Sequence, residues 1–162
     1  MFYKEYKYPD IEVLNKLKQD VKENVLDWYA YKTNIKGLMT GYKRYTKEAR
    51  NLFQPIIDFL STEYHIYESW GGLLRKGDHV ILHNHTPKPR VPNRNFTISG
   101  IVYLTDVLPG TYFKKYDTTI IPEVGKIVIF DANTLHEVKK SDSDEERINL
   151  AFNGRRKESY EF

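Results

Sequence analysis

The sequence contains no cysteine, which excludes disulfide bonds and metal sites built from thiolates. It has no apolar run long enough to span a membrane. The first residues, MFYKEYKYPD, lack the apolar stretch of a signal peptide. No internal repeat or low-complexity tract is present. These absences predict a cytoplasmic protein.

The composition is that of a globular protein. Its 162 residues are 40% hydrophobic and 29% charged, which suits one compact domain with a sizeable core. The net charge of +3 permits an anionic substrate but gives no strong signal for nucleic-acid binding.

The chain divides by pattern near residue 62. Before that point, Asp10 is a candidate N-cap for a helix whose apolar residues recur at helical spacing: Ile11, Leu14, Leu17, Val21 and Val25. A second helix is predicted from about Thr46 to Leu60, and Pro55 inside it predicts a kink or a late start. The stretch between them, IKGLMTGYKRY, suits a strand or a loop.

After residue 62 the pattern is that of β-strands separated by turn-like segments. The predicted strands are 64–74, 79–85, 96–105, 111–116, 126–131, 135–138 and 147–153. We therefore expect a mainly β, antiparallel double-sheet barrel braced by N-terminal helices. The predicted division is residues 1–62 as mainly helical support, 63–153 as the barrel core and 154–162 as a tail, all within one domain.

Alternation assigns the strand faces. In the last strand, Ile148, Leu150 and Phe152 share one face, and the opposite face carries Arg147, Asn149, Ala151 and Asn153. In the strand ending at 85, the face of His83 and His85 also takes His79 and Ile81. In residues 96–104 the polar face carries Thr97, Ser99 and Tyr103 with Ile101. Such polar faces are either exposed to water or line a cavity that holds a ligand.

Three histidines suggest what that cavity holds. The segment GDHVILHNHTPKP places His83 and His85 one residue apart, and His136 follows 51 residues after His85. Two imidazoles from one strand and a third from a neighbouring strand make a facial metal site with positions open for substrate and dioxygen. The alternative for each histidine alone is a structural or exposed side chain.

Arg147 follows His136 by eleven residues, on the polar face of the last strand. One interpretation is a surface arginine paired with the acidic segment DSDEE. The other is a guanidinium fork that binds a carboxylate at the back of the cavity, with Tyr103 adding a phenolic hydrogen bond.

Four stretches together resemble the iron(II)- and 2-oxoglutarate-dependent oxygenases, most closely the short prolyl-4-hydroxylase-like group of bacteria and cyanophages. They are ESWGGLLRKGDHVILHNH, SGIVYLTD, GKIVIFDANTLHEV and ERINLAFN, and they span about residues 68 to 153. The resemblance implies a double-stranded β-helix (a jelly-roll or cupin-like barrel). It also implies a cytoplasmic enzyme, located in the host if a phage encodes it.

The resemblance further implies the site. Iron(II) would bind His83 and His136, and also His85, where the wider superfamily commonly has Asp or Glu. Arg147, assisted by Tyr103, would bind the distal carboxylate of 2-oxoglutarate, and Asn149 would lie near this co-substrate. The implied reaction uses dioxygen, hydroxylates a C–H bond and releases succinate and CO2, and the family points to a peptide as the prime substrate.

Two other functions fit part of the pattern. The spacing of the two cupin motifs is matched by Gly77 with His83-x-His85 and by Gly125 to His136. The first alternative is therefore a three-histidine cupin dioxygenase, which would need no 2-oxoglutarate. The glutamate expected after the cupin histidine pair is absent. The third possibility is a non-enzymatic β-sandwich binding module with incidental histidines.

The segment TPKPRVPNRN, residues 86–95, separates the histidine pair from the next strand. Its cations Lys88, Arg90 and Arg94 suit either a solvated loop or a lid that attracts an anionic substrate. Under the lid hypothesis these three cations would be substrate-binding residues, and the solvated loop stays the alternative.

Overall fold

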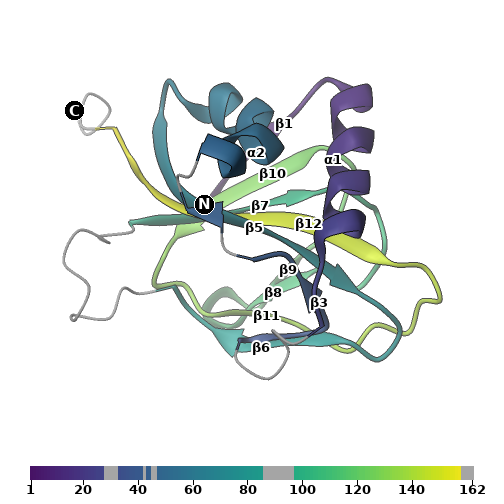
Figure 1. The fold of residues 1–162 in the computed structure, drawn as a ribbon. Coiled ribbons are helices and arrows are strands. Elements are labelled where there is room, and N and C mark those ends of the chain that lie inside the picture. The colour runs from purple at the N-terminus through teal and green to yellow at the C-terminus, as the bar shows by residue number, and fades with distance from the viewer. Residues whose placement is uncertain (28–32, 42, 45–46, 86–96, 158–162) are drawn as a thin grey trace.

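Two antiparallel sheets face each other in the computed structural model, and two helices cover the outer side of the larger sheet (Figure 1). The structure describes residues 1–27, 33–41, 43–44, 47–85 and 97–157, and of residues 43–44 and 47–52 only the backbone. The helices are α1 (Ile11–Asn24) and α2 (Lys47–Leu60), and a 3-10 turn covers Lys114–Tyr116.

The larger sheet has seven strands in the order β1-β10-β7-β12-β5-β3, with β4 also paired to β5. Their bounds are β1 (Tyr3–Lys7), β3 (Leu38–Met39), β4 (Lys43–Arg44), β5 (Tyr64–Leu74), β7 (Ile98–Tyr103), β10 (Lys126–Asp131) and β12 (Arg147–Arg156). Strand β12 lies between β5 and β7, so its inward-facing side chains occupy the middle of the sheet.

The smaller sheet has five strands in the order β2-β6-β11-β8-β9. They are β2 (Ile35–Lys36), β6 (His79–His83), β8 (Thr111–Phe113), β9 (Thr118–Ile120) and β11 (His136–Val138). In the pairing of β11 with β6, His136 lies directly opposite His83. Two of the three candidate ligands therefore meet across a strand pair.

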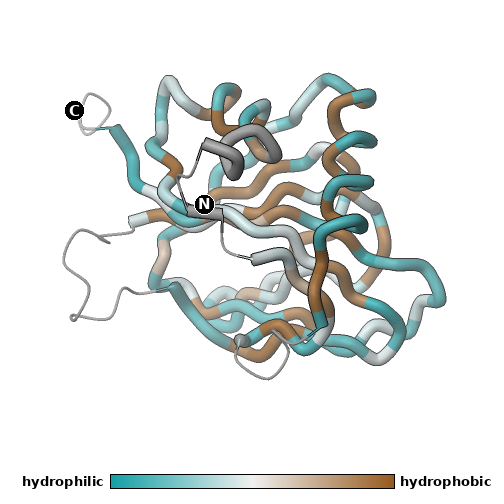
Figure 2. The backbone as a smooth tube through the Cα atoms, in the orientation of Figure 1, coloured by the Kyte–Doolittle hydropathy of each residue, from teal (hydrophilic) through white to brown (hydrophobic). Residues whose placement is uncertain are grey.

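Apolar residues alternate with polar ones along the helices and strands (Figure 2), and the apolar ones form two hydrophobic layers. One layer lies between the helices and the larger sheet, where Leu14, Leu17 and Val21 of α1 pack with Ile148, Leu150 and Phe152 of β12. The other layer lies between the sheets and contains Ile101, Tyr103, Phe113, Ile120, Val128 and Phe130. Neither layer includes the inward-facing residues of β12, so these positions can carry polar side chains.

Helix α1 begins where the sequence predicts. The Asp10 side chain accepts hydrogen bonds from the backbone N–H groups of Glu12 and Val13, as an N-cap does.

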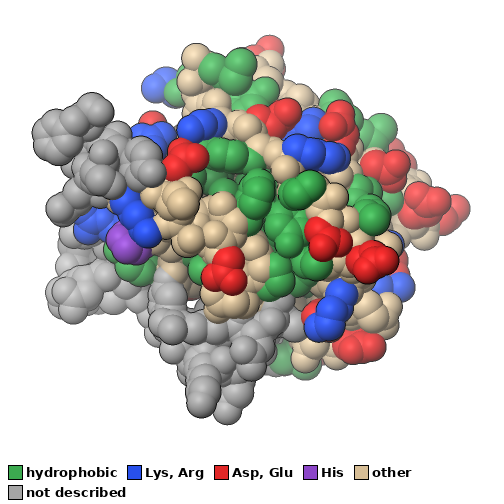
Figure 3. Space-filling view, turned by 90° about the horizontal axis from the view of Figure 1, so that it is seen from above, with side chains coloured by type: hydrophobic (Ala, Val, Ile, Leu, Met, Phe, Trp, Pro, Cys, Tyr) green, Lys and Arg blue, Asp and Glu red, His purple; other side chains and the backbone are tan. Residues whose placement is uncertain are grey.

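The side of the molecule that bears the helices shows grouped hydrophobic side chains between acidic and basic ones (Figure 3). Ile11, the first residue of α1, is exposed, whereas the pattern had placed it with the apolar residues of the helix.

The predicted fold class is confirmed: the chain is mainly β with two helices, and its sheets are those of a double-stranded β-helix. Strands 64–74 and 126–131 have the predicted bounds, and the other five predicted strands are present with shifted ends. The second helix begins at Lys47 and continues through Pro55, so the late start is not observed. The segment between the helices contributes the short strands β2, β3 and β4.

Two strands were not predicted. β1, with the sequence YKEYK, pairs with β10 at the edge of the larger sheet, and β9 pairs with β8 at the edge of the smaller one. An edge strand has few buried positions, so its sequence carries a weak apolar alternation. Strand β12 also extends to Arg156, beyond the predicted start of the tail at residue 154.

The predicted faces of β6 are wrong at its start. Val80 lines the central cavity together with His83, while Ile81 is 43% exposed. The cause is an irregularity of the ladder: His136 pairs with His83 and Val138 with Val80, so three steps along β6 match two along β11. Such a bulge inserts one residue and reverses the alternation beyond it.

Within the described residues, no helix combines the length and the apolar character needed to cross a membrane. The cytoplasmic location and the three-part division of the chain remain predictions.

Candidate metal centre and anion site

A cavity of about 360 Å³ lies between the two sheets. Its lining includes the three predicted histidines and, from the inner face of β12, Arg147, Asn149, Ala151 and Asn153. The alternation of the last strand therefore correctly predicts which side chains face the cavity. A volume of this order suits a small ligand.

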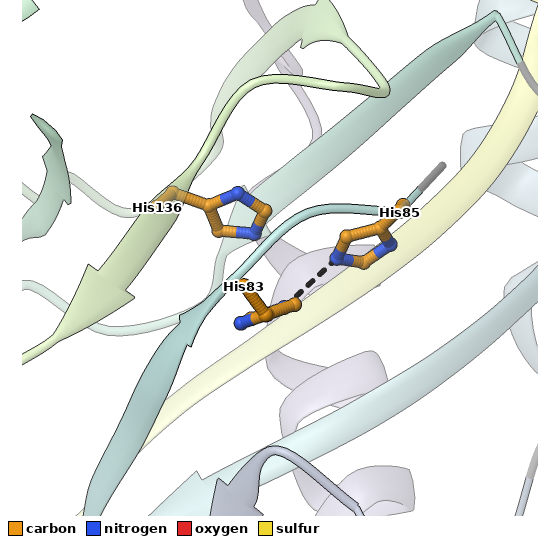
Figure 4. Close-up of side chains that lie close together, drawn as sticks. All are labelled: His83, His85 and His136. Carbon is orange, nitrogen blue, oxygen red and sulfur yellow. Dashed lines mark hydrogen bonds between the residues drawn. The ribbon is translucent and has the colours of Figure 1, made fainter. Parts of the chain in front are cut away.

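The three histidines come together in this cavity. Their rings are turned toward a common space, with His136 on β11 and the other two on or just beyond β6 (Figure 4). One nitrogen of each ring lies within 4.8 Å of the others. The ring centroids of His83 and His136 are 4.4 Å apart. Among the described residues, this is the one cluster of potential ligands that could hold a metal ion.

Hydrogen bonds fix the tautomer of each ring. Nδ1 of His83 lies 2.6 Å from the Ile81 carbonyl oxygen, and Nδ1 of His136 lies 2.9 Å from that of Thr134. A carbonyl oxygen only accepts, so both Nδ1 atoms carry the proton. Nδ1 of His85 lies 2.7 Å from Oδ1 of Asn153 and is bonded in the same way. Each Nε2 is consequently left with a free lone pair, as metal coordination requires.

The two Nε2 atoms of His83 and His85 lie only 3.0 Å apart. With both protons on Nδ1, two lone pairs face each other, and this contact is unfavourable without a cation between them. Metal–nitrogen bonds of about 2.1 Å at a right angle give a nitrogen separation of about 3.0 Å. The geometry of this pair therefore fits two neighbouring ligands of one metal ion.

Burial keeps the imidazoles neutral. It lowers the pKa of His85 to about 4, with a smaller effect from His83, and the pKa of His136 to about 3, with smaller effects from both other rings. Burial also lowers the pKa of His83. Protons therefore do not compete strongly for these nitrogens near neutral pH, so the site favours a metal ion.

Aromatic side chains wall the histidines. The Trp70 ring stacks on His85 with centroids 5.7 Å apart, and Phe130 packs edge-on against His136 at 5.0 Å. Sequence reasoning had not selected either residue, although Trp70 lies within the stretch ESWGG. These rings restrict water near the site and limit rotation of the imidazoles.

At the other end of the cavity lies Arg147, of which only 1% is exposed. Its Nε donates to the Pro109 carbonyl oxygen at 2.8 Å, and its Nη2 donates to Thr111 Oγ1 at 3.3 Å. Among the described residues no carboxylate lies within ion-pair distance of this guanidinium, so the alternative of a surface arginine paired with DSDEE is wrong. A buried arginine stays charged, and an unpaired buried charge is costly, so this end of the cavity fits an anion.

Thr111, which the sequence had not suggested, bonds both Arg147 and Tyr103. The Tyr103 hydroxyl lies 2.7 Å from Thr111 Oγ1, and its ring lies beside the Arg147 guanidinium at 5.7 Å. Thr111 lines the cavity, whereas Tyr103 is not among the lining residues. The role of Tyr103 in anion binding remains a prediction. Thr111 had carried no signal beyond its place at the start of a strand.

Asn149 lies on the cavity wall, opposite Tyr103 in the β12–β7 pairing, and its place near the co-substrate remains a prediction. The cations Lys88, Arg90 and Arg94, together with the rest of the 86–95 segment, lie outside the described residues. The lid therefore remains a prediction.

Residues 111–153 match a family model described as a putative 2OG-Fe(II) oxygenase. This match covers Thr111, His136 and Arg147. No curated protein matches the chain by sequence.

Solved structures share the fold. The viral collagen prolyl hydroxylase from Paramecium bursaria Chlorella virus-1, in complex with 2OG, has a TM-score of 0.69 at 16% identity, with 96% of each chain covered. A prolyl-4-hydroxylase from Pseudomonas putida has a TM-score of 0.64 at 16% identity, covering 96% of this chain and 93% of its own. The alpha-ketoglutarate-dependent epimerase SnoN from nogalamycin biosynthesis has a TM-score of 0.70 at 13% identity, covering 95% and 77%.

Proposed function

We propose that this chain works as an iron(II)- and 2-oxoglutarate-dependent oxygenase, a function that its fold and the family match over residues 111–153 support. The reaction we propose is hydroxylation of a C–H bond, with release of succinate and CO2. The single observation that carries the proposal is the buried Arg147, which has no carboxylate partner among the described residues, across the same cavity from three converging imidazoles.

Each residue has a proposed role. Nε2 of His83, His85 and His136 would hold the iron(II), which when bound supplies the chemistry of dioxygen activation. Arg147 would bind the distal carboxylate of 2-oxoglutarate, and the Thr111 hydroxyl next to it would add a hydrogen bond. The protein orients the co-substrate between these two ends and keeps water out.

The arginine favours 2-oxoglutarate over the cupin alternative. A three-histidine cupin dioxygenase uses no dicarboxylate and so has no need for a buried guanidinium, which here has no carboxylate partner among the described residues. The tight convergence of the three rings likewise disfavours a binding module with incidental histidines.

The prime substrate we propose is a peptide with a proline, because two structures of similar fold are named prolyl hydroxylases. SnoN shares the fold as well and is named an epimerase, so the fold alone does not select the substrate.

The test is a titration of 2-oxoglutarate into the iron(II)-loaded protein without oxygen. We expect a new visible absorption that saturates at one equivalent, and succinate release once oxygen is admitted. The Arg147→Gln variant should load iron but require at least about 100-fold more 2-oxoglutarate, because it loses a charge-assisted fork. An unchanged iron(II) spectrum in the parent protein would instead support the cupin alternative.

A further inference from the structure

His85 is held differently from the other two histidines. Backbone carbonyl oxygens orient the rings of His83 and His136, whereas a side chain, Asn153, orients His85. His85 also lies beyond the end of β6, where its backbone N–H donates to the Ala132 carbonyl oxygen at 2.7 Å. Its ring position therefore depends on side chains outside its own strand.

Asn153 is the centre of a buried row across three strands. It pairs in register with Ser99 of β7 on one side and Glu68 of β5 on the other. Its Oδ1 accepts from Nδ1 of His85 and from the Ser99 hydroxyl, both at 2.7 Å. Its Nδ2 donates to Glu68 Oε1 at 3.0 Å. All four side chains line the cavity.

The carboxylate sets the direction of this row. A carboxylate only accepts, so the Asn153 amide must turn its Nδ2 toward Glu68 and its Oδ1 toward His85. An oxygen at that position makes Nδ1 of His85 the protonated nitrogen and leaves Nε2 for the metal. Glu68 therefore determines the tautomer of His85 through one intervening side chain.

The charge balance of the metal site also points to Glu68. Three neutral imidazoles bring no negative charge to a divalent ion, and an uncompensated charge in a buried site is costly. Among the described residues that line the cavity, the charged side chains are Arg147 and Glu68, which is 8% exposed. Glu68 lies beside Asn153, six residues along β12 from Arg147, and so at the metal end.

We propose that Glu68 is a positioning residue for His85, acting through Asn153, and that it supplies from outside the ligand set the negative charge which the three histidines lack. This inference rests on the metal site of the proposed function. Because the relay polarises the imidazole, it also makes His85 a stronger ligand.

The first test is the Glu68→Gln variant. We expect its affinity for Mn²⁺ or anaerobic Fe²⁺ to fall by about tenfold, because loss of such an outer partner costs about 10–100-fold. In the metal-free protein, imidazole nitrogen NMR should show His85 changing from a single Nδ1–H tautomer to a mixture. His83 and His136 should keep theirs. The matched control is Glu63→Gln, which removes a surface carboxylate bonded to Lys4 and Tyr6.

A paired swap rebuilds the relay with the carboxylate and the amide exchanged. In the double variant Glu68→Gln/Asn153→Asp, the introduced amide can donate to the introduced carboxylate, which still accepts from His85 and Ser99. The hydrogen bonds are kept and the charge moves one residue closer to the imidazole. We expect metal affinity within about threefold of the parent protein and a restored Nδ1–H tautomer. This variant also serves as the test if Glu68→Gln alone does not fold.

The outcomes distinguish the two proposals. If the parent protein bound no metal, the proposed function would fall, while the tautomer of His85 in the metal-free protein would still test the relay. If Glu68→Gln kept both the affinity and the tautomer of the parent, the relay would be refuted and the metal site would stand. A double variant no better than Glu68→Gln alone would also refute it.

Discussion

At the residue scale, the site is defined by which atoms lack partners. Three Nε2 lone pairs point into one cavity because each Nδ1 proton is already bonded, and one guanidinium is buried without a carboxylate among the described residues. These unmet requirements are what a metal ion and a dicarboxylate would satisfy.

Mutation can show which hydroxyl near Arg147, that of Thr111 or that of Tyr103, contributes to 2-oxoglutarate binding. Thr111→Val should raise the KM for 2-oxoglutarate about tenfold, because it removes a hydroxyl that lines the cavity and bonds the guanidinium. Tyr103→Phe should change it by less than about threefold, since its hydroxyl contacts Thr111 outside the cavity lining. Thr111→Ser, which keeps the hydroxyl, is the control. A larger effect from Tyr103→Phe would restore the assignment suggested by the sequence.

The histidines predict a pH dependence of stability. Burial lowers the pKa of His85 to about 4 and of His136 to about 3, whereas unfolded imidazole has a pKa of about 6.5. Between these values the unfolded chain binds more protons than the folded one. The free energy of unfolding of the metal-free protein should therefore fall as the pH drops from about 6.5 toward about 4.

Urea unfolding at pH 7.5 and pH 5.5 measures this effect, because few carboxylates titrate in that interval. The His136→Gln variant should lose less stability between the two pH values than the parent. Equal losses in both proteins would show that other groups dominate.

At the element scale, the two faces of β12 have different roles. One face packs Ile148, Leu150 and Phe152 against the helices, and the other presents Arg147 and Asn153 to the cavity. Phe152 packs directly over Gly100 of the neighbouring strand β7, because a Cβ on Gly100 would lie only 2.0 Å from Phe152 Cζ.

Gly100→Ala should therefore destabilise the protein by about 2–3 kcal/mol, since overpacked cores lose stability of this order. Adding Phe152→Leu should recover part of the loss, because the smaller side chain makes room for the new methyl group. Chemical denaturation of the single and double variants measures both effects. Additive losses would show that the two side chains do not interact.

The elements also show what sequence reasoning could find. The alternation of β12 gave the correct faces because both faces are buried by different partners. The same rule failed in β6, where a bulge opposite β11 reverses the phase between Val80 and His83. A bulge depends on the partner strand, so it has no signal within its own strand.

At the scale of the whole molecule, the fold joins parts of the site that are distant in the chain. The cavity between the two sheets is lined by residues 68, 85, 99, 136, 147 and 153. The family match, over residues 111–153, includes only the last three of them. Metal binding to the three histidines should consequently stabilise the folded state, because the unfolded chain lacks this site.

We expect Mn²⁺ at about 100 times its Kd to stabilise the folded state by about 2.7 kcal/mol. For a chain of this length that corresponds to a rise in Tm of about 5–10 °C, which a chelator should reverse. Differential scanning calorimetry measures the shift. The His136→Gln variant should show little of it, and an equal rise there would place the bound metal elsewhere.

The sequence by itself determined the residue types and their order: a helical N-terminal part, a barrel of short strands, a His-x-His pair, a distant histidine and an arginine. These follow from local periodicity and spacing, which need no knowledge of the partner strands. Only the tertiary structure decided that Arg147 is buried without a carboxylate among the described residues, that Thr111 adjoins it, and that Glu68 and Asn153 stand behind His85. Those contacts join residues up to 85 positions apart, and their distances depend on the register of strands paired across the sheets.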